Sequence, residues 1–83
     1  MKIHVLFFAQ LKEAAGDSCL RLETREGASV EELVEKLMKG PRLAPFGRLP
    51  LLYAINESFV PKDAILSEGD TLALMTPVAG GAI

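Results

Sequence analysis

The chain has 83 residues and a net charge of −2, and 49% of its residues are hydrophobic. This length allows one domain, near the lower size limit for a hydrophobic core that is stable without disulfides or bound metals. The apolar content argues against disorder. The single cysteine excludes a disulfide framework and a cysteine-only metal site, and the absence of a Lys/Arg run argues against nucleic acid as a partner.

The first predicted element is a strand over residues 3–8, a β-branched and aromatic run. Alternation places three apolar residues, Ile3, Val5 and Phe7, on one face. The opposite face, with His4, Leu6 and Phe8, is also largely apolar, which indicates burial on both sides or contact with a partner. No signal peptide or membrane-spanning run is recognised, so a cytoplasmic protein without membrane contact is expected.

A short helix and a second strand are predicted next. Residues 9–15 are helix formers and stop at Gly16, a suitable C-terminal cap. Residues 18–24 alternate again, with Leu20 and Leu22 pointing inward. The connection is too short for a parallel crossover, so the two strands are expected to pair antiparallel.

The clearest helix follows Ser29. Ser29 and Glu32 form a capping box in which each side chain is expected to bond the other residue's backbone N–H. Gly40 and Pro41 end the helix. Its buried stripe follows the 3.6-residue period through Val30, Leu33, Val34, Leu37 and Met38.

The second half of the chain is predicted to complete a sheet. Residues 40–50 hold three prolines and are expected to form an irregular connection that Leu43 and Phe46 attach to the body. The elements expected after it are a strand at 51–55, a turn at 56–57, a short strand at 58–60, one helical turn at 64–66 and a last strand at 71–75.

One amphipathic helix packed across one face of a small mixed sheet would bury the apolar residues of the helix and of the strands together. We therefore predict an α+β fold, a β-grasp (ubiquitin-like) roll, with a domain at residues 1–76 and a flexible tail at residues 77–83. Phe8, Phe59 and Met75 are expected on the free face of the sheet, where an exposed apolar patch would mark an interface.

Side chains for independent catalysis are scarce. His4 is the only histidine, and Cys19 has no second cysteine for redox exchange. We expect no metal site and no cofactor, and a protein that is not an enzyme on its own. The uncharged tail is the one stretch that folding does not explain, because Gly80 and Gly81 can lie extended in a slot too narrow for other residues.

Five segments resemble the ubiquitin-like sulfur-carrier family, and within it the small subunits of molybdopterin synthase, MoaD. The likeness covers essentially the whole chain except the proline-rich connection. The matching segments are residues 5–10, the capped helix at 29–39, Ala54-Ile55-Asn56, residues 66–70 and Pro77-Val78-Ala79-Gly80-Gly81.

The resemblance implies a role for the tail as a sulfur donor. In the family, an E1-like (MoeB-like) enzyme adenylates the last glycine, which becomes a thiocarboxylate and gives its sulfur to cyclic pyranopterin monophosphate in molybdenum cofactor biosynthesis. By position, Gly81 carries the sulfur and Gly80 is its neighbour. The large subunit (MoaE-like) holds the catalytic residues in a heterotetramer. Its contacts, by the same likeness, are Phe8, Phe59, Met75, Pro77, Val78 and Ala79.

One departure from the family pattern leaves alternatives open. Family members commonly end at the second glycine, whereas Ala82 and Ile83 follow here. These two residues are removed by a protease, are an artificial addition, or mark a copy that docks without carrying sulfur; removal is the preferred hypothesis. The rival functions are a ThiS-like carrier of another sulfur pathway and a ubiquitin-like interaction module whose tail forms no acyl intermediate.

Overall fold

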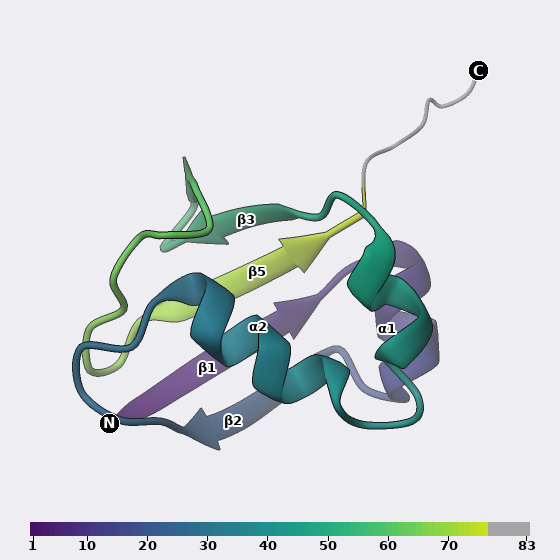
Figure 1. Cartoon of the computed structure of the whole chain (residues 1–83), viewed down its shortest axis with the longest axis horizontal. Helices are drawn as coiled ribbons and strands as arrows, with labels where there is room; N and C mark the ends of the chain where they lie inside the picture. The colour runs from purple at the N-terminus through teal and green to yellow at the C-terminus, as the bar shows by residue number, and fades with distance from the viewer. Residues whose placement is uncertain (77–83) are drawn as a thin grey trace.

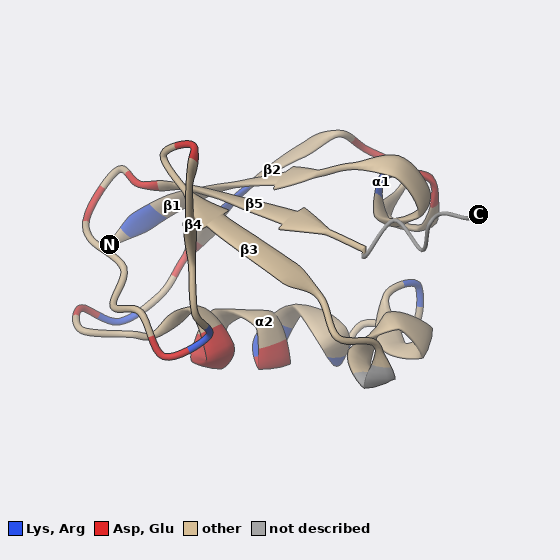
Figure 2. Ribbon diagram, turned by 90° about the horizontal axis from the view of Figure 1, so that it is seen from above, with Lys and Arg blue, Asp and Glu red and all other residues tan. Residues whose placement is uncertain are grey.

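The computed structural model describes residues 1–76, which form a mixed sheet with helix α2 lying across one face (Figures 1 and 2). The five strands run in the order β2-β1-β5-β3-β4; β1 and β5 are parallel and every other neighbouring pair is antiparallel. This confirms the predicted α+β, β-grasp class. The elements are β1 (Lys2–Phe7), α1 (Ala9–Ala15), β2 (Cys19–Glu23), α2 (Val30–Met38), the 3₁₀ helix η1 (Ala44–Arg48), β3 (Leu52–Ile55), β4 (Ser58–Val60) and β5 (Thr71–Met75). The division at residue 76 stays a prediction, because residues 77–83 lie outside the described part.

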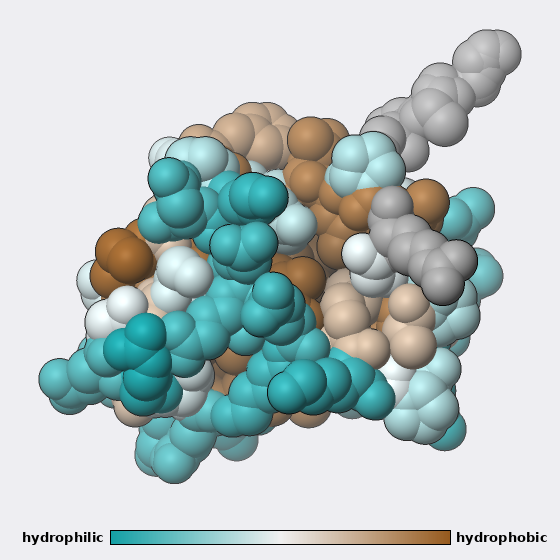
Figure 3. All heavy atoms as spheres, in the orientation of Figure 1, coloured by the Kyte–Doolittle hydropathy of each residue, from teal (hydrophilic) through white to brown (hydrophobic). Residues whose placement is uncertain are grey.

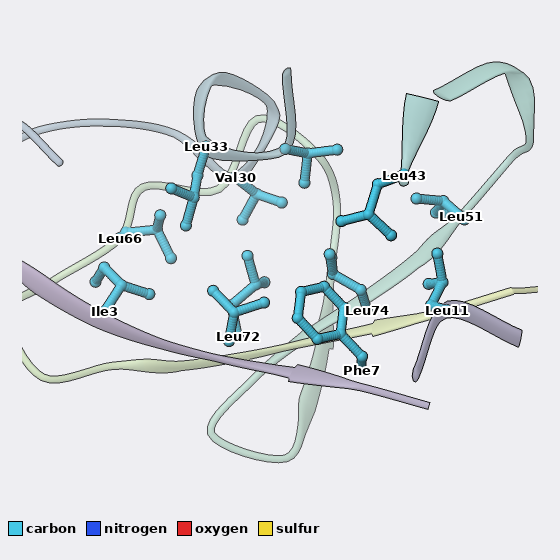
Figure 4. Close-up of a cluster of buried hydrophobic side chains, with 12 residues drawn as sticks. Ile3, Phe7, Leu11, Val30, Leu33, Leu43, Leu51, Leu66, Leu72 and Leu74 are labelled. Carbon is cyan, nitrogen blue, oxygen red and sulfur yellow. The ribbon is translucent and has the colours of Figure 1, made fainter. Parts of the chain in front are cut away.

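The core lies between the sheet and α2 (Figure 4). The central strands β1 and β5 contribute alternate residues that are fully or almost fully buried, as the period of two predicts. Helix α2 contributes Val30, Leu33 and Val34 from its apolar stripe. Leu20 shares the inward face of β2 but is 38% exposed, because β2 is an edge strand. The buried sheet residues are Ile3, Val5, Phe7, Leu72 and Leu74.

The N-terminus of α2 has partners for the N–H groups of its first turn. Ser29 Oγ accepts a hydrogen bond from the Glu32 N–H at 3.1 Å, as the capping box predicts. The Glu32 carboxylate does not reach back; it accepts two bonds from Arg25, at 2.8 Å from Nε and 2.7 Å from Nη2. Two carbonyls from residues 61–66 satisfy the remaining donors.

Those carbonyls correct one prediction, the helical turn at residues 64–66. Glu31 N–H donates to the Lys62 carbonyl at 2.8 Å, and Val30 N–H donates to the Ala64 carbonyl at 2.9 Å. Ile65 forms a bridge with Ser29 instead of a turn of its own. The backbone of this segment therefore caps α2, and its groups are not available for a local helix.

The connection over residues 40–50 is more regular than predicted, because it contains η1. Leu43 is buried and Phe46 is half-buried against the core, which confirms their predicted attachment. Seen from the side of α2, a band of hydrophilic residues runs along the helix (Figure 3). None of the helices within residues 1–76 is long and apolar enough to cross a membrane.

Asn56 and Asp70 tie the β3–β4 turn to the start of β5. Asn56 Nδ2 donates to Asp70 Oδ1 at 3.0 Å, and the Thr71 N–H donates to Asn56 Oδ1 at 3.0 Å. Asp70 Oδ2 also accepts from the Ser67 N–H at 2.8 Å. Two of the segments that carry the family resemblance thus have a structural role, which is to hold the hairpin against the central strands.

We expect Glu57→Gly to raise the free energy of unfolding by about 1 kcal/mol, because Glu57 has a left-handed backbone. Asn56 and Glu57 have φ values of +50° and +73°, as a two-residue hairpin turn requires, and glycine is favoured at the second position. Urea denaturation measures the change. Glu57→Ala removes the same carboxylate but keeps the backbone cost, so equal stabilisation by both variants would contradict this account.

Candidate functional site

The face of the sheet opposite α2 carries an apolar patch. Because Val5, Leu72 and Leu74 point into the core, their neighbours along β1 and β5 point outward. Cross-strand pairing brings these neighbours together: Leu6 lies beside Ala73, Ala73 beside Ala54, and Met75 beside Leu52. We call this surface the outer patch; its members are Leu6, Phe8, Leu52, Ala54, Phe59, Ala73 and Met75.

The outer patch forms a shallow recess of about 520 Å³. The aromatic rings at its rim are the most accessible members, with Phe59 72% exposed and Phe8 46% exposed. Large apolar groups left in water on one contiguous surface are typical of a protein interface. The recess is lined by Leu6, Phe8, Ala54, Asn56, Glu57, Phe59, Thr71, Ala73 and Met75.

Three of the predicted contact residues, Phe8, Phe59 and Met75, line this one recess. Sequence reasoning did not select Leu52, which pairs with Met75 and is 43% exposed. Alternation along β3 gives the face on which Leu52 lies, but only the pairing of β3 with β5 places that face beside Met75. The remaining predicted site residues, Pro77, Val78, Ala79, Gly80 and Gly81, lie outside the described residues.

Each aromatic side chain is positioned by a distinct local structure. Phe8 is the extended residue before α1, and Ala9 after it has a φ of +51°, which is strained for a residue other than glycine. This bend sends Leu11 into the core while Phe8 stays on the outer face. Phe59 is held in place by the hairpin turn that Asp70 anchors.

The tail begins at the rim of the outer patch. Met75 is the last residue of β5 and lines the recess, and Thr76 is the last described residue. A partner seated on the patch therefore lies next to the point from which residues 77–83 continue.

The polar and charged side chains of the described residues lie at the surface and form no group of metal ligands. Within residues 1–76, no three His, Cys, Asp or Glu side chains are close enough to hold a metal ion, and no charged or polar residue is buried. Cys19 is exposed and pairs with Leu6 at the margin of the patch. His4 is partly exposed between Arg21 and Thr71.

Comparison with known proteins shows likeness over nearly the whole chain. The ThiS family matches residues 5–81. A molybdopterin synthase sulfur carrier subunit from Haemophilus influenzae is 37% identical over 81 residues, which cover 95% of this chain and 99% of the relative. One from Mycobacterium tuberculosis is 32% identical, with 98% and 99% coverage. Among solved structures, SAMP1 from Haloferax volcanii has a TM-score of 0.83 at 27% identity and covers 98% of this chain and all (100%) of its own.

Proposed function

This chain belongs to the ThiS family, and on that premise we propose that it is the sulfur carrier subunit of a molybdopterin synthase. The observation that carries the proposal is the full-length likeness to carrier subunits of that synthase, at 37% identity over 99% of one relative. The exposed outer patch beside the tail agrees with a subunit that works inside a complex.

In this proposal the chemistry takes place at the carboxyl group of Gly81. An E1-like (MoeB-like) enzyme joins that carboxylate to AMP from ATP and releases pyrophosphate. A sulfur donor then displaces AMP and leaves a thiocarboxylate, whose sulfur passes to cyclic pyranopterin monophosphate. The family match ends at Gly81, which supports placing the reactive group there rather than at Ile83. A carrier of this kind needs no acid, base or metal of its own.

The outer patch is the proposed docking surface for the large subunit (MoaE-like) and, in turn, for the adenylating enzyme. Both partners must reach the same tail, and the patch is the exposed apolar surface nearest to it. Phe8, Phe59 and Met75 provide apolar side chains for burial, and residues 77–79 follow them into the partner's site. The catalytic side chains belong to the large subunit, and two copies of each subunit form the complex.

The rival functions are a ThiS-like carrier of another pathway and a ubiquitin-like module. The carrier names of the relatives from H. influenzae and M. tuberculosis favour the molybdopterin pathway over the first. The likeness to SAMP1, a small archaeal modifier protein, keeps the second open to experiment.

Reconstitution tests the proposal. A chain ending at Gly81 and charged with sulfur should convert cyclic pyranopterin monophosphate to molybdopterin when mixed with the large subunit of the same organism. The uncharged chain is the matched control and should yield no product. Sulfur transfer to a thiazole synthase but not to the pyranopterin would assign the chain to the other pathway, and attachment of the tail to a lysine would make it a modifier.

Cys19 provides a footprint of docking. Its cross-strand neighbour Leu6 belongs to the outer patch, so a bound large subunit should slow alkylation of the exposed Cys19 thiol. The control chain carries Cys19→Ser and Glu35→Cys, which moves the thiol to an exposed position on α2, on the other side of the sheet. Mass spectrometry should show protection of Cys19 only; equal protection of both thiols would place the partner elsewhere.

A further inference from the structure

The outer face of the sheet is polar at the end away from the tail. Along β1 the outward residues run from Leu6 to His4 to Lys2, and the register places Arg21 beside His4 and Glu23 beside Lys2. A shallow recess of about 280 Å³ lies here, lined by Lys2, Arg21, Leu22 and Glu23. The face therefore has an apolar end next to the tail and a charged end across β1 and β2.

Arg21 is the cation at this end that the fold does not use. Lys2 lies directly opposite an acidic residue, Glu23, in the strand register. Arg25 and Lys62 form ion pairs with Glu32 and Glu31 at the α2 side, whereas Arg21 has no ion pair within residues 1–76. Arg21 is exposed, and its cross-strand neighbour His4 carries no negative charge.

This end of the sheet carries charges of both signs, because Glu23 lies beside Lys2 and the Glu68 carboxylate accepts a hydrogen bond from the Lys2 N–H. The chain has a net charge of −2, and acidic residues are prominent on α2, on the opposite side of the sheet (Figure 2). An unpaired guanidinium on an otherwise acidic protein attracts a carboxylate on an approaching surface, and its planar fork can hold the two carboxylate oxygens together.

We propose that Arg21 is a polar anchor of the docking face, pairing with a carboxylate of the large subunit when the outer patch is buried. This rests on the proposed function, which supplies the partner. Apolar contact has no preferred direction, so the patch alone allows several rotations of the partner. The ion pair at Arg21 lies one strand away and about 7 Å along the sheet from Leu6. This second point of contact selects one rotation of the large subunit on the patch, the one that brings the tail to its site.

The test compares Arg21→Glu with Lys39→Glu in binding to the large subunit of the same organism. Lys39 is exposed at the end of α2, so both variants change the net charge equally, but Lys39 lies on the other side of the sheet. We expect Arg21→Glu to raise Kd about tenfold or more and to remove most of its salt dependence, while Lys39→Glu leaves both near wild type. Circular dichroism checks that both variants fold.

The outcomes separate this inference from the proposed function. If wild-type chain binds the large subunit and Arg21→Glu binds equally well, the anchor is overturned and the sulfur-carrier function stands. If wild-type chain does not bind the large subunit at all, the proposed function fails first. Tenfold weakening by both variants would show a long-range charge effect and would also overturn the specific role of Arg21.

Discussion

We expect a chain ending at Gly81 to become charged with sulfur when it is incubated with the E1-like enzyme, ATP and a sulfur donor, and the full 83-residue chain to remain uncharged. The reason is covalent. Adenylation needs a free carboxylate, and in the full chain the Gly81 carbonyl is part of the peptide bond to Ala82. Intact mass spectrometry measures the result as the replacement of one oxygen by sulfur. We expect nearly complete charging of the shorter chain and none at Gly81 of the longer one.

The matched control for this prediction is a trimmed chain with Gly81→Ala. It has a free carboxylate at the same distance from the domain, but its added methyl group has to fit into the narrow partner site that is proposed to receive the diglycine. We expect it to be charged much more slowly. Equal charging of the full chain through its Ile83 carboxylate would contradict the assignment of Gly81. Mass analysis of the protein from its native cells then shows whether Ala82 and Ile83 are removed before the reaction.

We expect Phe59→Asp to abolish docking to the large subunit without unfolding the carrier. Phe59 is 72% exposed, so its removal costs the folded monomer little. A buried aromatic anchor at an interface contributes about 2–4 kcal/mol, which corresponds to an affinity loss of roughly 30- to 1,000-fold. An aspartate in its place adds the cost of burying an unpaired charge. Calorimetry or surface binding measures Kd, and thermal unfolding checks the monomer.

Ile65→Asp is the matched control for Phe59→Asp. Ile65 is also a large apolar residue, 60% exposed, but it lies on the segment that pairs with Ser29 and does not line the recess. We expect its variant to bind as the wild type does. If both variants bind normally, the outer patch is not the docking surface. If Phe59→Asp unfolds, the assignment of Phe59 as a free surface residue is wrong.

The amino-acid sequence by itself determined the elements and their faces. The two-residue period of residues 3–7 and 71–75, the capping box at Ser29 and the stripe of α2 follow from local geometry, so each could be recognised without a fold. The diglycine near the C-terminus could also be recognised from the sequence, because its proposed role depends on the absence of a side chain at Gly80 and Gly81. These features also carried the family resemblance, which the comparison confirmed over residues 5–81.

Only the tertiary structure decided which residues meet. Leu6 and Ala73 are far apart in the chain and become neighbours because β1 and β5 pair in parallel. The antiparallel register of β1 and β2 places Arg21 beside His4. The segment at 64–66 looks locally like a helical turn, yet its backbone satisfies the first donors of α2. In that segment long-range hydrogen bonding competes with local preference, and a short segment lacks the length to stabilise its own helix. The outer patch and its charged end are therefore properties of the sheet register.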